Sequence, residues 1–264
     1  MLLVKKSMMY KISIITINLN DKIGLEKTIK SVVSQTYISL EFLIIDGAST
    51  DGSLDVIETQ KEHIHCLISE KDSGIYNAMN KGIQRAKGDY LLFLNSGDIL
   101  TSNTAIEDFV THTNFNGDII YGDYKFKKGE KIYPDTLTPF YFLRTSLPHQ
   151  STFFKKEVFE TMGLYDESLK IASDRAFYIK SFLSNQIKFQ HVNYALTLFD
   201  LEGLSNNAKH LEIKRKEDTR IFKEYYGSFY NDYIKYVSLE QELSKLKRKS
   251  LKGVLKRLKK RLYK

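Results

Sequence analysis

The first hundred residues alternate between short runs of apolar, mostly β-branched residues and segments whose apolar side chains recur at helical spacing. The runs predict buried strands, and the segments between them predict amphipathic helices that cover those strands. Such an alternation indicates an α/β fold with a Rossmann-like, mostly parallel central sheet flanked by helices. The predicted strands are residues 12–17, 40–45, 67–68 and 90–94. The first predicted helix has Asn20 or Asp21 as its N-cap, the second has Ser49 or Thr50 as its cap and runs from about Asp51 to Lys61, and the third begins at Ser73.

The rest of the chain is less regular. We expect strands around Phe153 and over residues 190–198, helices over 156–162 and 173–183, and mostly charged helix after residue 207. The predicted organisation is one α/β domain over residues 1–206 and a helical, basic C-terminal region over 207–264.

Polar side chains, among them Asn20 and Glu70, gather at the ends of the predicted strands. Asn18 follows the first strand, Asp46 the second, Asp72 the third, and Asn95 with Asp98 the fourth. Ligands of open parallel sheets bind beyond the carboxyl ends of the strands, so these residues are candidates for one ligand site. Asp98 follows a central strand and suits a hard cation such as Mg²⁺, which takes few protein ligands and fills its shell with phosphate oxygens and water.

Several common motifs are absent from the sequence. There is no Gly-x-x-x-x-Gly-Lys-Ser/Thr phosphate loop, and no Gly-x-Gly-x-x-Gly follows the first strand. No Cys and His residues have zinc-site spacing, and no Gly-x-Ser-x-Gly elbow occurs. The α/β pattern therefore does not indicate a phosphate-loop ATPase, a dinucleotide enzyme or a serine hydrolase.

Four stretches resemble the family 2 glycosyltransferases, which have the GT-A fold. They match that family in order and spacing, and a weaker match continues to about Ser205. The stretches are residues 14–18 (Ile-Ile-Thr-Ile-Asn), 44–53 (which begins Ile-Ile-Asp-Gly), 69–82 (which contains Ser-Gly-Ile-Tyr) and 87–98 (which ends Asn-Ser-Gly-Asp), followed more weakly by 148–154 and 172–174.

The resemblance implies a binding site for a nucleotide-sugar donor. It places Thr16 and Asn18 in the nucleoside pocket, gives Asp46 a hydrogen bond to the pyrimidine or ribose, and places Asp72 near the ribose and sugar. Asn95 is also expected to contribute to donor binding.

The resemblance also implies a metal ion. Asp98 matches the last acid of the family's Asp-x-Asp-like motif, which implies a divalent cation, Mg²⁺ or Mn²⁺. Relatives commonly carry an acid where this chain has Gly97, so only one carboxylate remains, and weaker metal affinity is expected.

The implied chemistry is transfer with inversion. Asp174 matches the carboxylate that acts as the base and removes the proton of the acceptor hydroxyl while the hydroxyl oxygen attacks the anomeric carbon. His149 is expected near the acceptor and the diphosphate. A structural role is the alternative for each of the main residues. Such roles are a turn cap for Asp46, helix or segment caps for Asp72, Asp98 and Asp174, and packing for His149.

The positive charge is concentrated at the C-terminus. Eleven of the 40 Lys and Arg residues lie in residues 243–264, which contain no acid, so the remainder of the chain has 29 basic and 32 acidic residues. This distribution argues against a nucleic-acid-binding core. Apolar residues recur at helical spacing in this tail and predict a basic amphipathic helix on an anionic membrane. These residues are Leu251, Val254, Leu255, Leu258 and Leu262.

Two alternatives for the tail are a solvated charged segment, and a surface that binds nucleic acid or a partner protein. The single cysteine, Cys66, fits a reducing compartment, and no signal peptide or membrane-spanning segment is evident. We therefore expect a cytoplasmic enzyme, peripheral at the inner face of the cell membrane.

The expected activity is that of an inverting hexosyl- or N-acetylhexosaminyltransferase. Family frequency favours a UDP-sugar donor, and family habit together with the tail favours a glycan or polyprenyl-linked acceptor in surface-polysaccharide assembly. One alternative is a catalytically impaired relative that binds nucleotide sugars. Another is a nucleotidyltransferase, which would normally carry a Gly-rich loop with Arg or Lys where this chain has Asn18-Leu19-Asn20-Asp21.

Overall fold

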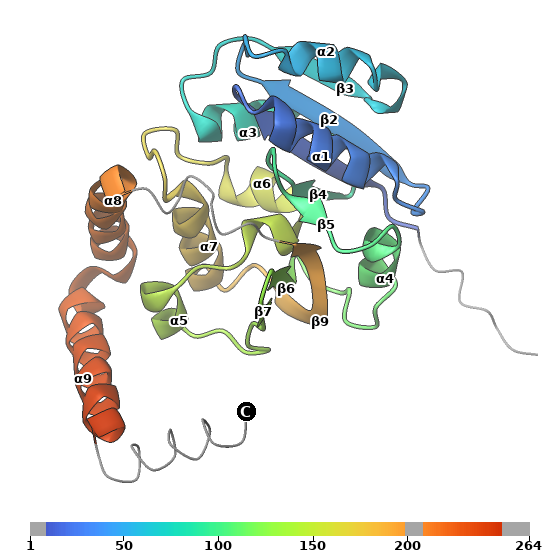
Figure 1. Ribbon diagram of the computed structural model, residues 1–264. Helices are drawn as coiled ribbons and strands as arrows, with labels where there is room; N and C mark the ends of the chain where they lie inside the picture. The colour runs from blue at the N-terminus through green and yellow to red at the C-terminus, as the bar shows by residue number, and fades with distance from the viewer. Residues whose placement is uncertain (1–8, 199–207, 250–264) are drawn as a thin grey trace, which may run out of the picture.

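The computed structural model describes residues 9–198 and 208–249, in which one mixed sheet is flanked by helices (Figure 1). The first half contains β1 (Ile12–Asn18), α1 (Lys22–Val33), β2 (Leu40–Asp46), α2 (Ser53–Glu58), β3 (Cys66–Ser69), α3 (Ile75–Arg85), β4 (Tyr90–Phe93), β5 (Ile99–Leu100) and α4 (Ala105–Val110). The second half contains β6 (Ile119–Phe126), β7 (Gly129–Lys131), α5 (Pro139–Arg144), β8 (Thr152–Lys155), α6 (Lys156–Met162), α7 (Ser173–Leu183), β9 (Phe189–Leu198), α8 (Ala208–Tyr226) and α9 (Tyr230–Lys249).

The strand order within this sheet is β3-β2-β1-β4-β8-β6-β9-β5, with β7 paired to β6. The first four of these strands are parallel, which confirms the predicted α/β architecture. β8 is antiparallel to both β4 and β6. β6 therefore runs in the same direction as β4, and the carboxyl ends of β1, β2, β4 and β6 lie at one edge of the sheet.

The alternation of side chains along β1 divides the core into two layers. Ile12 and Ile14 pack with apolar residues of α1 and α4, whereas Ile15 and Ile17 pack with residues of α3, α6 and α7. Successive strand residues face opposite sides of a sheet, so helices on both faces follow directly from the apolar run.

The structure confirms one predicted helix cap and contradicts another. Asp21 caps α1 by accepting a hydrogen bond from the backbone N–H of Gly24 at 3.0 Å, as expected. The second helix begins at Ser53, and its first backbone N–H donates to Asp51. The prediction that Ser49 or Thr50 caps it is therefore wrong, because Ser49 hydrogen-bonds to the end of β1 instead.

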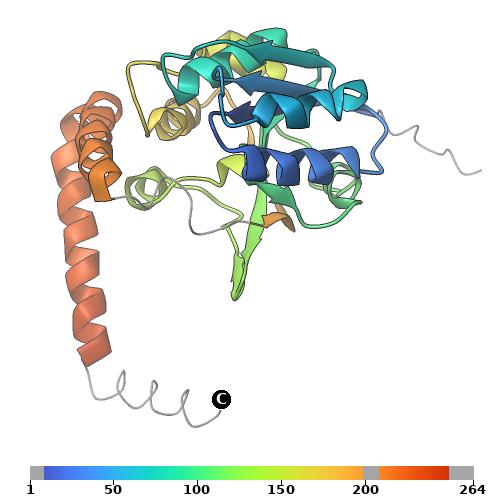
Figure 2. The same cartoon turned by 45° about the horizontal axis from the view of Figure 1, so that its top comes forward.

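The C-terminal helices differ in how they contact the α/β layers. α8 contributes the buried residues Ile221, Phe222 and Tyr226 to the same core as α3 and α7. α9 buries no residue and runs away from the sheet (Figure 2). None of the helices between residues 9 and 249 that the structure describes is both long and apolar enough to cross a bilayer. The predicted division at residue 206 and most of the predicted amphipathic tail, residues 250–264, lie outside the described residues.

A buried histidine joins β6 and β9. Nε2 of His191 lies 3.0 Å from a carboxylate oxygen of Asp123, and Nδ1 lies 2.6 Å from one of Asp135. Burial lowers the pKa of His191, but the hydrogen bonds and charges of the two carboxylates outweigh it, so the net pKa is raised above its usual value.

This raised pKa predicts a pH-dependent contribution to stability. A raised folded-state pKa means that the contribution is fully present below the unfolded-state value and is lost as pH rises through the folded-state value. We expect the stability difference between the wild type and His191→Gln to be largest near pH 6 and to shrink at higher pH. Urea unfolding of both proteins at a series of pH values measures this, and a difference that grows with pH would contradict the assignment.

Candidate active site

Asn18 ends β1 and joins three segments of the chain through its side-chain amide. Its Nδ2 donates to Asp46 Oδ1 at 2.8 Å and to Ser49 Oγ at 3.1 Å. Its Oδ1 accepts from the hydroxyl of Ser96 at 2.8 Å. The ends of β1 and β2 and the turn after β4 therefore meet at one edge of the sheet.

Asp46 is completely buried beside Asn18. Its Oδ2 also accepts from Ser49 N at 2.9 Å and from the Ser69 hydroxyl at 2.8 Å. Burial raises the pKa of Asp46, but these donors outweigh it and hold the pKa below its usual value. The carboxylate thus caps the turn and orients Asn18 and Ser49, while its predicted contact with the nucleoside stays a prediction.

Thr16 lies in β1, paired with Ile44 of β2. It is completely buried, and its hydroxyl oxygen has no hydrogen-bond partner among the described residues. The prediction that Thr16 lines the nucleoside pocket also stays a prediction.

The turn after β4 holds Asn95 and Asp98. Asp98 Oδ2 accepts from Asn95 N at 2.9 Å, and Thr28 Oγ1 donates to the main-chain oxygen of Asp98 at 2.9 Å. Gly97 has a φ of +97°, a conformation that favours glycine, which gives a physical reason for Gly97 in place of the family's acid. Burial raises the pKa of Asp98 to about 7.

The donor set at this turn fits a sparsely ligated cation. The Asn95 side-chain oxygen is buried and has no hydrogen-bond partner among the described residues, and the Asp98 carboxylate is close by in the same turn. Within residues 9–198 and 208–249 no group of three or more His, Cys, Asp and Glu residues is suited to a metal. A cation here would therefore take most of its ligands from phosphate oxygens and water, which suits Mg²⁺ or Mn²⁺.

Asp72 follows β3 and is largely buried in an ion pair. Its carboxylate lies 2.6 Å from Lys81 Nζ, which also contacts Glu70 at 2.9 Å. A Cβ added to Gly47 would lie 3.1 Å from Asp72 Oδ2, so Asp72 packs against the residue that follows Asp46. The N-cap residue of α3 is Gly74 and no side chain caps the helix, so Asp72 does not act as its cap.

Asp174 contacts the start of α3, and His149 contacts the last residue of β4. Tyr76 donates its hydroxyl to Asp174 Oδ1 at 3.0 Å. The His149 ring centroid lies 4.7 Å from that of Phe93, and neither ring nitrogen has a partner among the described residues. Burial lowers the pKa of His149 to about 4 despite the opposing charge of Asp174, so the ring is neutral near pH 7.

The predicted site residues therefore lie in two adjoining groups. Asn18, Asp46, Asn95 and Asp98 form the strand-end group, with Asp72 at its border. His149 and Asp174 form the second group, which contacts the end of β4 through Phe93 and the start of α3 through Tyr76.

Sequence reasoning missed several residues that hold these groups together. The hydroxyls of Ser49, Ser69 and Ser96 bond the strand-end group, and Lys81 pairs with Asp72. The sequence signal for these serines is their place within the stretches that resemble the family, at or just after the ends of strands. For Tyr76 the sequence gives site and packing roles equal weight, and the hydrogen bond to Asp174 supports the former.

Comparison of the sequence with known proteins identifies relatives. The sequence profile of glycosyl transferase family 2 matches residues 13–178. An uncharacterized glycosyltransferase of Mycobacterium tuberculosis is 32% identical over 180 residues, which are 65% of this chain and 69% of the relative. The putative teichuronic acid biosynthesis glycosyltransferase TuaG of Bacillus subtilis is 38% identical over 90 residues, which are 33% of this chain and 36% of TuaG.

Solved structures with this fold include two that hold a nucleotide sugar. TarS 1–349 of S. aureus, in complex with UDP-GlcNAc, has a TM-score of 0.64 at 18% identity, over 81% of this chain and 66% of TarS 1–349. A mannosyltransferase of Pyrobaculum calidifontis, in complex with GDP-Man and Mn²⁺, has a TM-score of 0.62 at 13% identity, over 83% of this chain and 64% of that one. At these identities the likeness concerns the fold alone, which confirms the predicted GT-A architecture.

Proposed function

This chain belongs to glycosyl transferase family 2, and we propose that it moves a sugar from a UDP-sugar to a hydroxyl of a glycan or polyprenyl-linked acceptor in cell-surface polysaccharide biosynthesis. One observation carries the proposal. Asn18 hydrogen-bonds to both Asp46 and Ser96, which joins three of the stretches that resemble the family at one edge of the sheet. The UDP-GlcNAc bound to TarS supports the donor class, and the name of TuaG supports the pathway.

The proposed donor site is the strand-end group. Thr16, Asn18 and Asp46 would bind the nucleoside, and Asp72 would lie beside the ribose and sugar. Asn95 and Asp98 would hold the divalent cation, which supplies charge neutralisation for the leaving diphosphate. The Mn²⁺ found with the Pyrobaculum mannosyltransferase supports this choice of ion.

The proposed acceptor side is the second group. Asp174 accepts the proton of the acceptor hydroxyl while the hydroxyl oxygen bonds to the anomeric carbon and the bond to the diphosphate breaks, which inverts the configuration. His149, neutral near pH 7, borders the acceptor and the diphosphate without adding charge.

Donor binding tests this function directly. In a thermal-shift panel of UDP-, GDP- and dTDP-sugars with Mn²⁺ or Mg²⁺, we expect a UDP-sugar with a divalent cation to raise the melting temperature most. Transfer or slow hydrolysis of that donor separates an active enzyme from an impaired relative that only binds it. Absence of stabilisation by every nucleotide sugar would exclude the proposed function.

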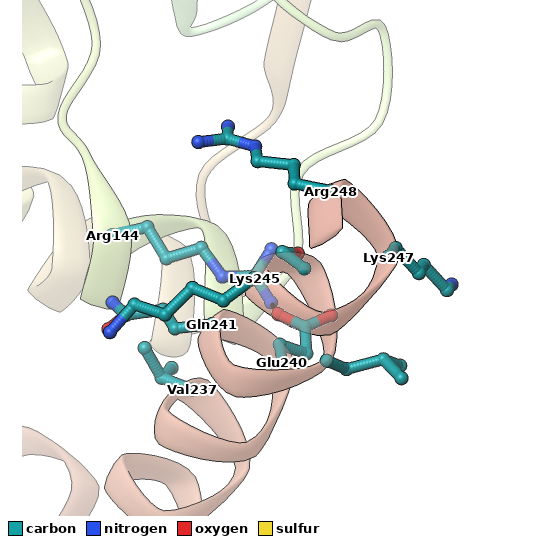
Figure 3. Close-up of a pocket in the computed structure, with 9 residues that line it drawn as sticks. Arg144, Val237, Glu240, Gln241, Lys245, Lys247 and Arg248 are labelled. Carbon is teal, nitrogen blue, oxygen red and sulfur yellow. Dashed lines mark ion pairs between the residues drawn. The ribbon is translucent and has the colours of Figure 1, made fainter. Parts of the chain in front are cut away.

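The basic C-terminus supports a site of action at the inner face of the membrane. Lys245, Lys247 and Arg248 of α9 line a groove of about 570 Å³ together with Arg144 of α5, which pairs with Glu240 (Figure 3). Basic residues near an anionic surface contribute about 1 kcal/mol each. We therefore propose that residues 243–264 bind anionic lipid.

Vesicle sedimentation tests the membrane contact. The full chain is expected to co-sediment with vesicles that contain anionic lipid and to remain in solution with neutral ones. Deletion of residues 243–264 is expected to abolish the binding while donor binding stays unchanged. Equal sedimentation of the truncated chain would show that the tail is not the anchor.

A further inference from the structure

The short segment that leads into α7 is hydrogen-bonded by residues of two helices from distant parts of the chain. Residues 170–172 immediately precede α7, and Asp174 is the second residue of that helix. Tyr76 of α3 contacts this segment from one side, and Glu217 of α8 contacts it from the other. The two contacts meet at the backbone of Ile171, which Tyr76 binds through the oxygen and Glu217 through the N–H.

Tyr76 contacts both the segment and Asp174. Its buried hydroxyl lies 2.7 Å from the Ile171 oxygen and 3.0 Å from Asp174 Oδ1. A hydroxyl donor near an ionised carboxylate stabilises the charged form and fixes the orientation of the carboxylate. The one hydroxyl proton is shared between these two oxygens, so Tyr76 ties the Asp174 carboxylate to the segment that precedes α7.

Glu217 binds the backbone of the three residues that precede α7. The N-cap residue Ala172 has no side chain able to accept a hydrogen bond. The Glu217 carboxylate accepts from Lys170 N at 2.7 Å and from Ile171 N and Ala172 N at 3.0 Å each. These three bonds fix the segment directly before α7, and with it the position of the helix start, relative to α8.

The residue next to Glu217 strengthens the same junction. Asp218 pairs with Arg175 at 2.8 Å, and Arg175 Nε donates to the main-chain oxygen of Phe142 at 2.9 Å. The Arg175 guanidinium also lies 4.7 Å from the ring centroid of Phe222 on α8. Glu217 and Asp218 of α8 therefore bind residues that come before and after Asp174 in the sequence.

We propose that Tyr76 and Glu217 are positioning residues for Asp174, so that α8, which belongs to the C-terminal region, completes the catalytic site. The proposal rests on the proposed role of Asp174 as the base. Tyr76 lies four residues after Asp72. The start of α3 therefore lies between the proposed donor site, which includes Asp72, and the proposed acceptor site, which includes Asp174. A displacement of the base by about 1 Å is enough to cost about 10²-fold in rate.

The test uses two conservative variants of the full chain and a matched control for each. Tyr76→Phe keeps the ring and removes the hydroxyl, and Tyr165→Phe is its control, because the buried Tyr165 hydroxyl has no hydrogen-bond partner among the described residues. Glu217→Gln keeps the shape and removes the charge. Its control is Glu224→Gln, an exposed residue of the same helix.

The expected result separates positioning from general stability. Tyr76→Phe is expected to lower kcat by about 10- to 100-fold with little change in the donor KM. Glu217→Gln is expected to lower kcat by about tenfold at unchanged donor KM, and both controls are expected to match the wild type.

Three contrary results would overturn the proposal in different ways. If Asp174→Asn abolishes transfer but Tyr76→Phe and Glu217→Gln behave like their controls, the positioning roles are wrong and the proposed base stands. If Asp174→Asn leaves transfer intact, the base assignment fails, and the positioning proposal fails with it. A loss of melting temperature with unchanged kcat and donor KM in the two variants would also overturn the proposal.

Discussion

Asp174→Asn is expected to reduce kcat by about 10²–10⁴-fold, because an amide does not accept the proton that the attacking hydroxyl must lose. The amide oxygen of asparagine still accepts the Tyr76 hydrogen bond, so the start of α7 is expected to remain in place. The dissociation constant of the nucleotide-sugar donor, measured by calorimetry, is expected to stay within about twofold of the wild-type value. The reason is that the donor is proposed to bind to the strand-end group, which does not include Asp174.

Asp166→Asn is the matched control for this loss. Asp166 is an exposed acid eight residues before Asp174, and it accepts a hydrogen bond from the backbone of Ser168. Transfer by this variant is expected to equal that of the wild type. A normal kcat for Asp174→Asn, or a kcat loss of equal size in both variants, would remove Asp174 from its proposed role.

Asp98→Asn is expected to reduce turnover by about 10²–10³-fold and to raise the Mn²⁺ concentration needed for half-maximal activity. The change replaces the only carboxylate in the turn after β4 with a neutral and weaker ligand, so the charge of the leaving diphosphate is less well compensated. Initial rates measured over a series of Mn²⁺ concentrations give both quantities.

Asp89→Asn controls for the loss of a carboxylate beside β4. Asp89 precedes this strand and accepts a hydrogen bond from Lys11 N at 2.7 Å, at the opposite end from Asp98. Its variant is expected to lose some stability with no change in the Mn²⁺ response. An unchanged Mn²⁺ response in Asp98→Asn would exclude Asp98 as a metal ligand.

The α/β half of the fold was predictable because its signals are local. The β-branched run of β1 and the apolar run of β4 are buried on both faces, and such runs are characteristic of central parallel strands. The antiparallel placement of β8 between β4 and β6 was not predictable, since strand order depends on long-range pairing that no short stretch encodes.

The strand-end residues were predictable for a geometric reason. Parallel register places Asn18 beside Asp46, so the last residues of two neighbouring strands become neighbours in space. The support from Tyr76 and Glu217 was not predictable in the same way. Glu217 lies 45 residues from Ala172, to which it bonds, and nothing in the sequence near Glu217 distinguishes it from the other acids of a charged helix.

The central claim is that side chains from separate stretches of the chain form one nucleotide-sugar site at a single edge of the sheet. A crystal structure of the full chain with UDP and Mn²⁺ tests it most directly. We expect the nucleoside beside Asn18 and Asp46, Mn²⁺ between Asp98 and the diphosphate, and the Asp174 carboxylate facing the space beyond the diphosphate. UDP bound at another surface, or Mn²⁺ held without Asp98, would contradict the account.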